Sequence, residues 1–315
     1  MSVRPSQQPA VAAKSARRQP THTDFLDPAA LATVEDLELV ARGVVEGFKH
    51  GMHRSPYVGF SIEFSSHRQY LPGDDLRHVN WKLYGRQDRL YIKQYDAETN
   101  LDLYLIVDAS RSMLMASQRL TKITYGVMLA ASLAHLALTQ RDAVGLTLHS
   151  NKIIDHVKPR AHPEQLFEIL LPLSRLDSFE PCESPRVLHE VAELMPRRGL
   201  VVLIGDFFFD MEELSKALEH LKVGGHDMLL FHVLDPLEQE LTISGNVRFR
   251  DLETGREIIT RADDLRSGYG TAVEQWRAQM RKCCNGLDID YVPLSTRDRL
   301  DRALATYLAN RSEMY

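Results

Sequence analysis

Short, wholly apolar runs alternate along this chain with segments of helical periodicity. An apolar run without polar alternation is typical of a strand covered on both faces, whereas apolar residues three and four positions apart indicate a helix. The runs predict strands at residues 103–107, 143–148, 153–157, 200–204, 228–234 and 289–294. Helical spacing predicts helices at residues 33–50, 122–140, 163–176, 185–194, 214–221, 273–280 and 300–307. This order predicts an α/β fold, with an open and mostly parallel sheet and helices on both of its faces.

Three regions of the chain differ in composition. Residues 1–32 are predicted to be a disordered tail, because their first part carries basic and small polar side chains with little apolar surface. Residues 33–100 are predicted to form a small N-terminal α+β module. Residues 101–315 carry the α/β rhythm, with an antiparallel edge over residues 143–157 and a hairpin insertion near 245–262.

Composition and charge exclude several classes of protein. The formal net charge of -5 gives no overall attraction to nucleic acid or to anionic membranes. The three cysteines, Cys182, Cys283 and Cys284, form neither a disulfide framework nor a zinc-binding pattern. The longest apolar stretch, residues 127–138, is too short to span a bilayer. We therefore expect a cytoplasmic protein without membrane insertion.

Candidate chemistry follows the strand at residues 103–107. Asp108, Ser110 and Ser112 occupy alternate positions, and an extended segment would turn their oxygens to one side. One carboxylate with neutral hydroxyls at the carboxyl end of a strand suits a hard cation such as Mg²⁺ or Mn²⁺. The alternative is that Asp108 and Ser110 merely cap the next turn or helix.

A second acid follows the strand at residues 200–204, which ends in Gly205 and Asp206. Ligands of open α/β sheets bind beyond the carboxyl ends of the strands, so we expect Asp108 and Asp206 to converge there. Gly205 would let the backbones approach closely, although a tight turn explains a glycine equally well. Asp235 also ends a strand, but the proline after it predicts a plain turn.

Two sets of motifs resemble known families. The D-A-S-R-S element at Asp108, the α/β order and the strand-ending Asp206 resemble a von Willebrand factor A domain with its metal-ion-dependent adhesion site (MIDAS). Residues 65–113 resemble the signature of the bacterial family called domain of unknown function 58, and they read SSHRQYLPGDDLRHVNWKLYGRQDRLYIKQYDAETNLDLYLIVDASRSM. DLETGRE at residues 251–257 is similar to that family's later hairpin. The resemblance begins near residue 43 and is loose after residue 209.

The resemblance has implications for partners and ligands. Family members resemble adaptors or scaffolds encoded beside MoxR-type AAA+ ATPases, and no established enzyme activity is implied. Members often carry transmembrane helices before the signature, and none is expected here. Where an adhesion site usually supplies a loop Thr, this chain has Cys182, Glu183 and Ser184. Ser184 is then either a substitute metal ligand or the N-cap of a helix that begins at Pro185.

The signature segment also holds the candidate partner-binding residues, namely Arg68, Asp74, Asp75, Arg77, Trp81 and Lys82. Basic and aromatic side chains interleaved in this way are typical of a platform for single-stranded nucleic acid. The acids among them would pair with the bases internally, however, and the aromatic rings would form a small core. We therefore expect protein binding or internal packing here and no contact with nucleic acid.

These observations favour a metal-dependent, protein-binding adaptor. There is no G-x-x-x-x-G-K-[ST] loop and no G-x-G-x-x-G after a strand, so ATP hydrolysis would have to come from a partner ATPase. We expect a cation on Asp108, Ser110, Ser112 and Asp206, with an open position for an Asp or Glu of a client protein. The alternative is a Mg²⁺-dependent hydrolase of the phosphohydrolase type at Asp108 and Asp206, but the sequence places no general base or nucleophile beside Asp108.

Overall fold

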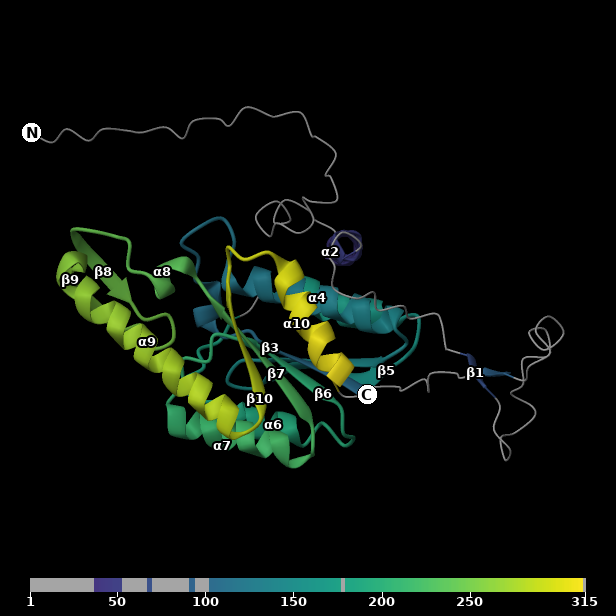
Figure 1. Cartoon of the computed structure of the whole chain (residues 1–315). Coiled ribbons are helices and arrows are strands. Elements are labelled where there is room, and N and C mark those ends of the chain that lie inside the picture. Colours follow the sequence, from purple (N-terminus) through teal and green to yellow (C-terminus); the bar gives the residue numbers. More distant parts are fainter. Residues whose placement is uncertain (1–36, 53–66, 70–90, 94–101, 177–178, 314–315) are drawn as a thin grey trace, which may run out of the picture.

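The computed structural model describes residues 37–52, 67–69, 91–93, 102–176 and 179–313, and a six-stranded sheet forms its centre (Figure 1). The strands lie in the order β10-β7-β6-β3-β4-β5, and all neighbours are parallel except the antiparallel edge pair β4 and β5. Their bounds are β3 (Asp102–Asp108), β4 (Ala143–His149), β5 (Ile153–Arg160), β6 (Leu200–Gly205), β7 (Asp227–Leu234) and β10 (Ile289–Ser295). The predicted α/β fold and its antiparallel edge are confirmed.

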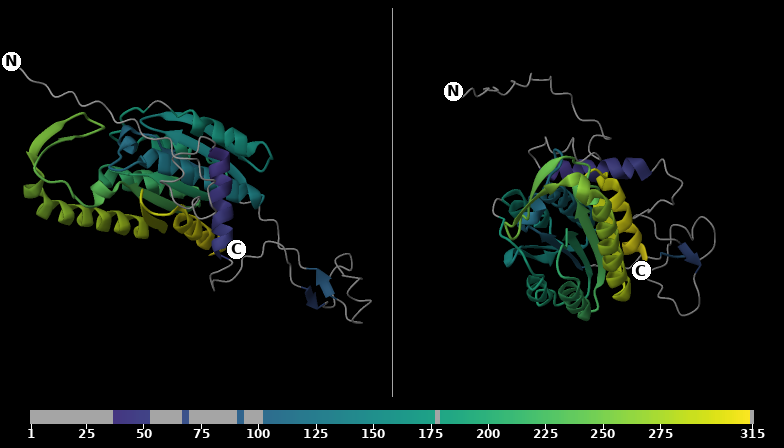
Figure 2. Two further views of the ribbon diagram at one scale, coloured as in Figure 1. Left: turned by 90° about the horizontal axis from the view of Figure 1, so that it is seen from above. Right: turned by 90° about the vertical axis from the view of Figure 1, so that its left-hand side faces the viewer.

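Helices cover both faces of this sheet, as Figures 1 and 2 show. One layer consists of α2 (Leu37–Met52), α4 (Lys122–Thr139), α5 (Gln165–Ser174) and α10 (Leu300–Glu313). The other consists of α6 (Val187–Ala192), α7 (Met211–Val223) and α9 (Ala262–Gly286). Because side chains alternate along a strand, Leu103 and Leu105 of β3 pack into the first layer, whereas Tyr104 and Ile106 pack into the second. Burial on both faces explains why these strands are apolar throughout.

The central helix of the first layer is α4. Thr121 caps its N-terminus, where the Thr121 side chain accepts a hydrogen bond from the Thr124 N–H at 3.1 Å. By length and composition α4 passes as a membrane span, but 72% of it is buried inside the protein. It is therefore the core helix of the domain.

The first layer also includes α2, whose Val40, Ala41, Val44 and Val45 join the core around α4. The helix predicted near the start of the N-terminal module thus packs as part of the sheet domain. Within the rest of that module the structure describes one small antiparallel pair, β1 (His67–Gln69) with β2 (Tyr91–Lys93). The remaining predictions for the module, and the one for residues 1–32, lie outside the described residues.

A hairpin and the long helix α9 extend from one end of the sheet domain (Figure 2). The hairpin consists of β8 (Asn246–Arg250) and β9 (Glu257–Arg261), within the predicted insertion near 245–262. Helix α9 starts directly after it, eleven residues before the start that apolar spacing predicts. The extra turns contain Gly268 and Gly270, which weaken the sequence signal for a helix.

The order of the strands places the candidate site. The two neighbours of β3 are β4, which follows it in the chain, and β6, which comes later. The chain therefore changes direction across the sheet at β3 and β6, and their carboxyl ends meet at the topological switch point where open α/β sheets bind ligands.

Candidate functional site

Asp108 is the last residue of β3 and is fully buried. Its Oδ1 accepts a hydrogen bond from the Ser110 N–H at 2.8 Å, and the hydroxyl oxygens of Ser110 and Ser112 lie 3.0 Å apart. The predicted oxygen cluster thus comes together, but not on an extended segment: the chain turns at Arg111 into the short 3₁₀ helix η3 (Arg111–Leu114). Ser110 takes the N-cap position of η3 without a capping bond from its side chain, whereas Asp108 accepts the Ser110 N–H as a turn cap does. The capping alternative is therefore supported for Asp108 but not for Ser110.

Asp206 directly follows β6 and is also buried. Gly205 brings it close to β3, because a Cβ at position 205 would lie 2.8 Å from the Asp108 Cβ and 3.2 Å from the Asp108 Oδ2. The predicted close approach at this glycine is confirmed. Phe207 then turns the chain away with a φ of 51°, a left-handed conformation that is costly for a bulky residue and that clusters at functional sites.

A buried lysine, which the sequence reasoning missed, completes the base of the site. Lys122 Nζ donates to Asp206 Oδ2 at 2.7 Å and to Glu238 Oε1 at 2.6 Å, and the lysine side chain is 0% exposed. Buried charges need partners of opposite sign, and here one ammonium takes two. A signal was present, since Lys122 is the single charged residue in an otherwise apolar helix.

Glu238 belongs to the short helix α8 (Pro236–Gln239), which Asp235 caps. Asp235 Oδ1 accepts from the Leu237 N–H, and Glu238 Oε2 accepts from the Asp235 N–H, both at 2.8 Å, which is a capping box. Asp235 Oδ2 also accepts from the Ser117 N–H at 2.8 Å. The plain turn predicted at Asp235 was therefore wrong, and the residue instead orients the glutamate that binds Lys122.

A carboxylate from the hairpin bridges two loops of the site. The Ser112 N–H donates to Glu253 Oε1 at 2.5 Å, and the Cys182 N–H donates to Glu253 Oε2 at 2.6 Å. These donors lie 141 and 71 positions away in the sequence. Such a contact has no local sequence pattern, and the sequence reasoning missed it.

Ser184 contacts a different partner. Its hydroxyl donates to Glu213 Oε2 on α7 at 2.8 Å. It does not cap α6, whose N-cap residue is Arg186. The loop reaches the site through the backbone N–H of Cys182, two residues earlier. The Cys182 thiol, whose pKa burial and the nearby Asp108 raise to about 12, stays protonated.

The two central carboxylates are held in different protonation states. Burial and the neighbouring Asp206 raise the pKa of Asp108 to about 7. Burial also opposes ionisation of Asp206, but Lys122 outweighs it and lowers the pKa of Asp206 below its ordinary value. The Lys122 pKa is raised, because its two carboxylate partners overcome the effect of burial. Asp206 is therefore the fixed anion of the site, and Asp108 exchanges its proton near neutrality.

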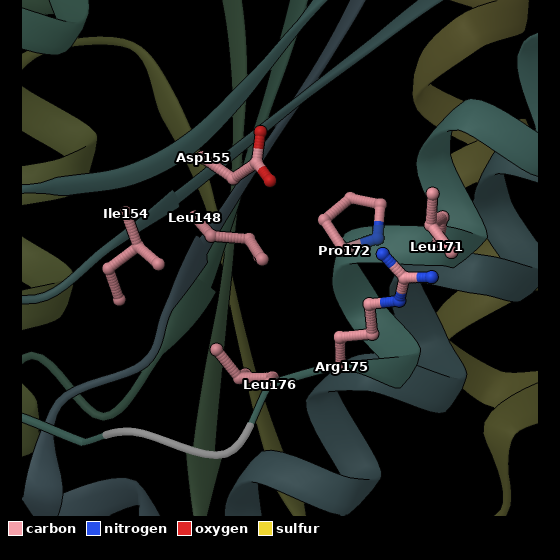
Figure 3. A pocket seen from close by; sticks show the side chains of 7 residues that line it. All are labelled: Leu148, Ile154, Asp155, Leu171, Pro172, Arg175 and Leu176. Atoms are coloured by element: carbon pink, nitrogen blue, oxygen red, sulfur yellow. The ribbon is translucent and has the colours of Figure 1, made fainter.

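Asp74, Asp75, Arg77, Trp81 and Lys82 lie outside the described residues, and of Arg68 only its backbone pairing with Ile92 is described. A small cavity of about 170 Å³ lies elsewhere, between the β4–β5 edge and α5 (Figure 3). Its lining is mostly aliphatic and shares no residue with the site, so we assign no chemistry to it.

The fold is an open, mostly parallel α/β sheet with two acids, Asp108 and Asp206, at its switch point. The family model described as "Protein of unknown function DUF58" matches residues 66–279, and the chain belongs to this family. The resemblance to domain of unknown function 58 is confirmed.

Several known proteins are similar to this chain. The uncharacterized proteins Rv1480 of Mycobacterium tuberculosis and Mb1516 of Mycobacterium bovis are 25% identical over 277 residues, 87% of each chain. An aerotolerance-related membrane protein of Bacteroides fragilis is 14% identical, with 68% of this chain and 99% of that chain covered and a TM-score of 0.47. BatB of Bacteroides thetaiotaomicron is 14% identical over 68% and 98% of the two chains, with a TM-score of 0.44. None of these similarities transfers an activity to this chain.

Proposed function

We propose that this protein is a protein-binding adaptor that holds a divalent cation at Asp108 and Asp206 and uses it to bind an acidic residue of a partner. The observation that carries the proposal is at Asp108. This carboxylate is fully buried, and its Oδ2 has no hydrogen-bond partner among the residues that the structure describes. An unpaired buried oxygen is costly, and a cation would satisfy it.

The charge balance of the site supports a cation. Among the described residues, the carboxylates of Asp206 and Glu238 share one positive group, the Lys122 ammonium, and Asp108 lies close enough to Asp206 and Glu253 for both to raise its pKa. Burying such an excess of negative charge is unfavourable, and a proton on Asp108 relieves only part of it. A divalent cation would replace that proton and bring the site closer to neutrality.

The kinds of ligand fit Mg²⁺ or Mn²⁺. Across the described ranges, no group of three or more His, Cys, Asp or Glu side chains is arranged to hold a metal ion. Two carboxylates alone would not complete a site, so a cation would take Asp108 and Asp206 together with the hydroxyls of Ser110 and Ser112, directly or through water. Mg²⁺ is usually bound in this way, by one or two carboxylates, and keeps positions for waters or a partner's oxygen. When bound, it would supply a positive charge to recognise a carboxylate.

We further propose that the partners are a MoxR-type AAA+ ATPase and a client protein that presents an Asp or Glu, and that they meet in the cytoplasm. Family membership and the missing nucleotide-binding loops support this proposal. The hydrolase alternative gains no support, because the sequence places no general base or nucleophile beside Asp108.

Titration with Mn²⁺ after EDTA treatment tests the metal proposal. We expect binding by calorimetry and a rise in melting temperature, because a ligand of the native state adds about 2.7 kcal/mol at a hundredfold excess over its dissociation constant. Asp108→Ala should abolish both effects. Asp102→Ala, at the opposite end of β3, is the matched control and should respond like the wild type. Equal responses in wild type and Asp108→Ala would show that the cation binds elsewhere or not at all.

A further inference from the structure

The backbone N–H groups of Ser112 and Cys182 lie on two loops at the carboxyl edge of the sheet and point to one carboxylate. Glu253 accepts one hydrogen bond on each oxygen, at 2.5 and 2.6 Å. A charged carboxylate that takes a separate backbone donor on each oxygen makes a strong and geometrically specific contact. The two loops therefore form a notch that recognises a carboxylate, which we call the amide notch.

The turn of the hairpin is built to present Glu253. Asp251 Oδ1 accepts from the Glu253 N–H at 2.9 Å, and Asp251 Oδ2 accepts from the Thr254 hydroxyl at 2.5 Å. Gly255 adopts a φ of +72°, which favours glycine. The Asp251 carbonyl also accepts from the Gly255 N–H at 2.9 Å. These contacts give a physical role to the DLETGRE motif: its Asp and Gly fold the turn, and its Glu is the ligand.

The hairpin behind this turn exposes most of its side chains. All residues of β8 and β9 are exposed or half-buried, and Ile258 and Ile259 are 65% and 71% exposed. At its base, the Gly245 N–H donates to Asp263 Oδ2 at 3.0 Å. A two-stranded hairpin is marginal by itself, so its docking depends strongly on Glu253.

We propose that Glu253 is the internal occupant of the amide notch and that an acidic side chain of a partner takes its place when the hairpin swings away. This inference goes beyond the proposed function, because it assigns a second contact for an acidic side chain of a partner. It does not require the cation, because both donors are backbone N–H groups. The partner segment is an acidic one, since both donors of the notch hold a carboxylate in this structure.

The amide notch can be tested by nuclear magnetic resonance on ¹⁵N-labelled full-length protein in EDTA, which reports on the Ser112 and Cys182 N–H groups directly. In Glu253→Ala we expect the Ser112 and Cys182 N–H groups to exchange with solvent roughly ten- to hundredfold faster than in the wild type, since a charge-assisted hydrogen bond is lost at each. Sodium acetate should then shift both resonances in Glu253→Ala in a saturable way. Acetamide, which has the same shape without the charge, should not shift these resonances. In the wild type, where Glu253 occupies the notch, acetate should cause no shift over the same concentration range.

Two further variants complete the test. Glu257→Ala removes a glutamate of the same hairpin that faces Arg248 at 3.7 Å, and it should leave both amides protected. Gly255→Ala strains the turn and should raise exchange at both amides with Glu253 still present. Unchanged exchange in Glu253→Ala, or acetate shifts absent from these two amides, would overturn the proposal. Because no divalent cation is present, this result is independent of whether Mn²⁺ binds at Asp108.

Discussion

Lys122 Nζ lies 2.7 Å from Asp206 Oδ2, and the two side chains are 0% and 3% exposed. Together with Glu238 at 2.6 Å, this contact joins the start of α4 to the end of β6 and to α8. A surface ion pair contributes little to stability, but a buried one leaves an uncompensated charge when a partner is removed. The ammonium is therefore a structural part of the site and fixes the charge of Asp206.

Lys122→Met should destabilise the protein by about 3–5 kcal/mol, because it leaves the buried Asp206 and the half-buried Glu238 without their counter-charge. Urea denaturation measures the loss. Lys216→Met is the matched control, since Lys216 contacts Glu212 at 2.6 Å but both side chains are largely exposed, and its loss should stay below about 1 kcal/mol. Similar losses in the two variants would show that the buried pair has no special role.

Gly205→Ala should cost roughly 1–3 kcal/mol, because the new methyl group would lie 2.8 Å from the Asp108 Cβ and push the two strand ends apart. We also expect it to abolish stabilisation by Mn²⁺. Gly268→Ala, on α9 with no atom within 4 Å, should instead stabilise the protein by up to about 1 kcal/mol. Thermal melts with and without Mn²⁺ compare the two variants, and normal Mn²⁺ stabilisation in Gly205→Ala would contradict the close packing proposed for Asp108.

His149 and Asp108 should affect the pH dependence of stability in opposite directions. Burial lowers the pKa of His149 from 6.5 to about 4, so the unfolded state binds more protons between these values and stability falls with acidification. Burial and Asp206 raise the pKa of Asp108 to about 7, so the metal-free folded state binds more protons between about pH 4 and 7, and this contribution falls as pH rises.

Each proton by which the folded and unfolded states differ contributes about 1.4 kcal/mol per pH unit to the slope of the unfolding free energy against pH. Between pH 4.5 and 6 in EDTA, His149→Gln should therefore lower the slope of stability against pH by about this amount. Asp108→Asn should raise the slope by the same amount, because it removes the opposing contribution. Urea titrations at several pH values give the slopes, and changes of the same sign in both variants would contradict the assignment.

The fold was predictable because each central strand is buried on both faces and most helices have one apolar face. The local pattern of apolar residues therefore separates strands from helices. Asp108 and Asp206 followed from the same logic, since they end strands. The contacts that complete the site depend on strand order and on loops far apart in the sequence. Glu253 reaches Ser112 across 141 positions, and no periodicity reports such a contact. Only Lys122 left a local trace, as a lone charge in an apolar helix.

The segment from Arg68 to Lys93 is predicted not to bind nucleic acid. A groove that follows phosphates would lose affinity steeply as salt rises, because counterions are released on binding. We expect weak binding of single-stranded oligonucleotides by fluorescence anisotropy at 50 mM salt, with no change in Arg77→Glu or Trp81→Ala. Tight, salt-sensitive binding that either variant abolishes would assign this segment to nucleic acid instead.

The association with a MoxR-type ATPase should depend on the cation and on the oxygens that would hold it. An open position on Mg²⁺ is filled best by a carboxylate, so the partner should present an Asp or Glu at the carboxyl edge of the sheet. Asp108→Ala and Ser110→Ala should weaken this association without unfolding the domain, because both residues lie at the rim of the sheet and their removal opens no apolar cavity. Asp102→Ala, at the other end of β3, should bind like the wild type.

Pull-downs from cell extract with Mg²⁺ or EDTA, read by mass spectrometry, compare the wild type with these three variants. Recovery of the same ATPase and clients in every lane, including EDTA and Asp108→Ala, would mean that the partners bind another surface.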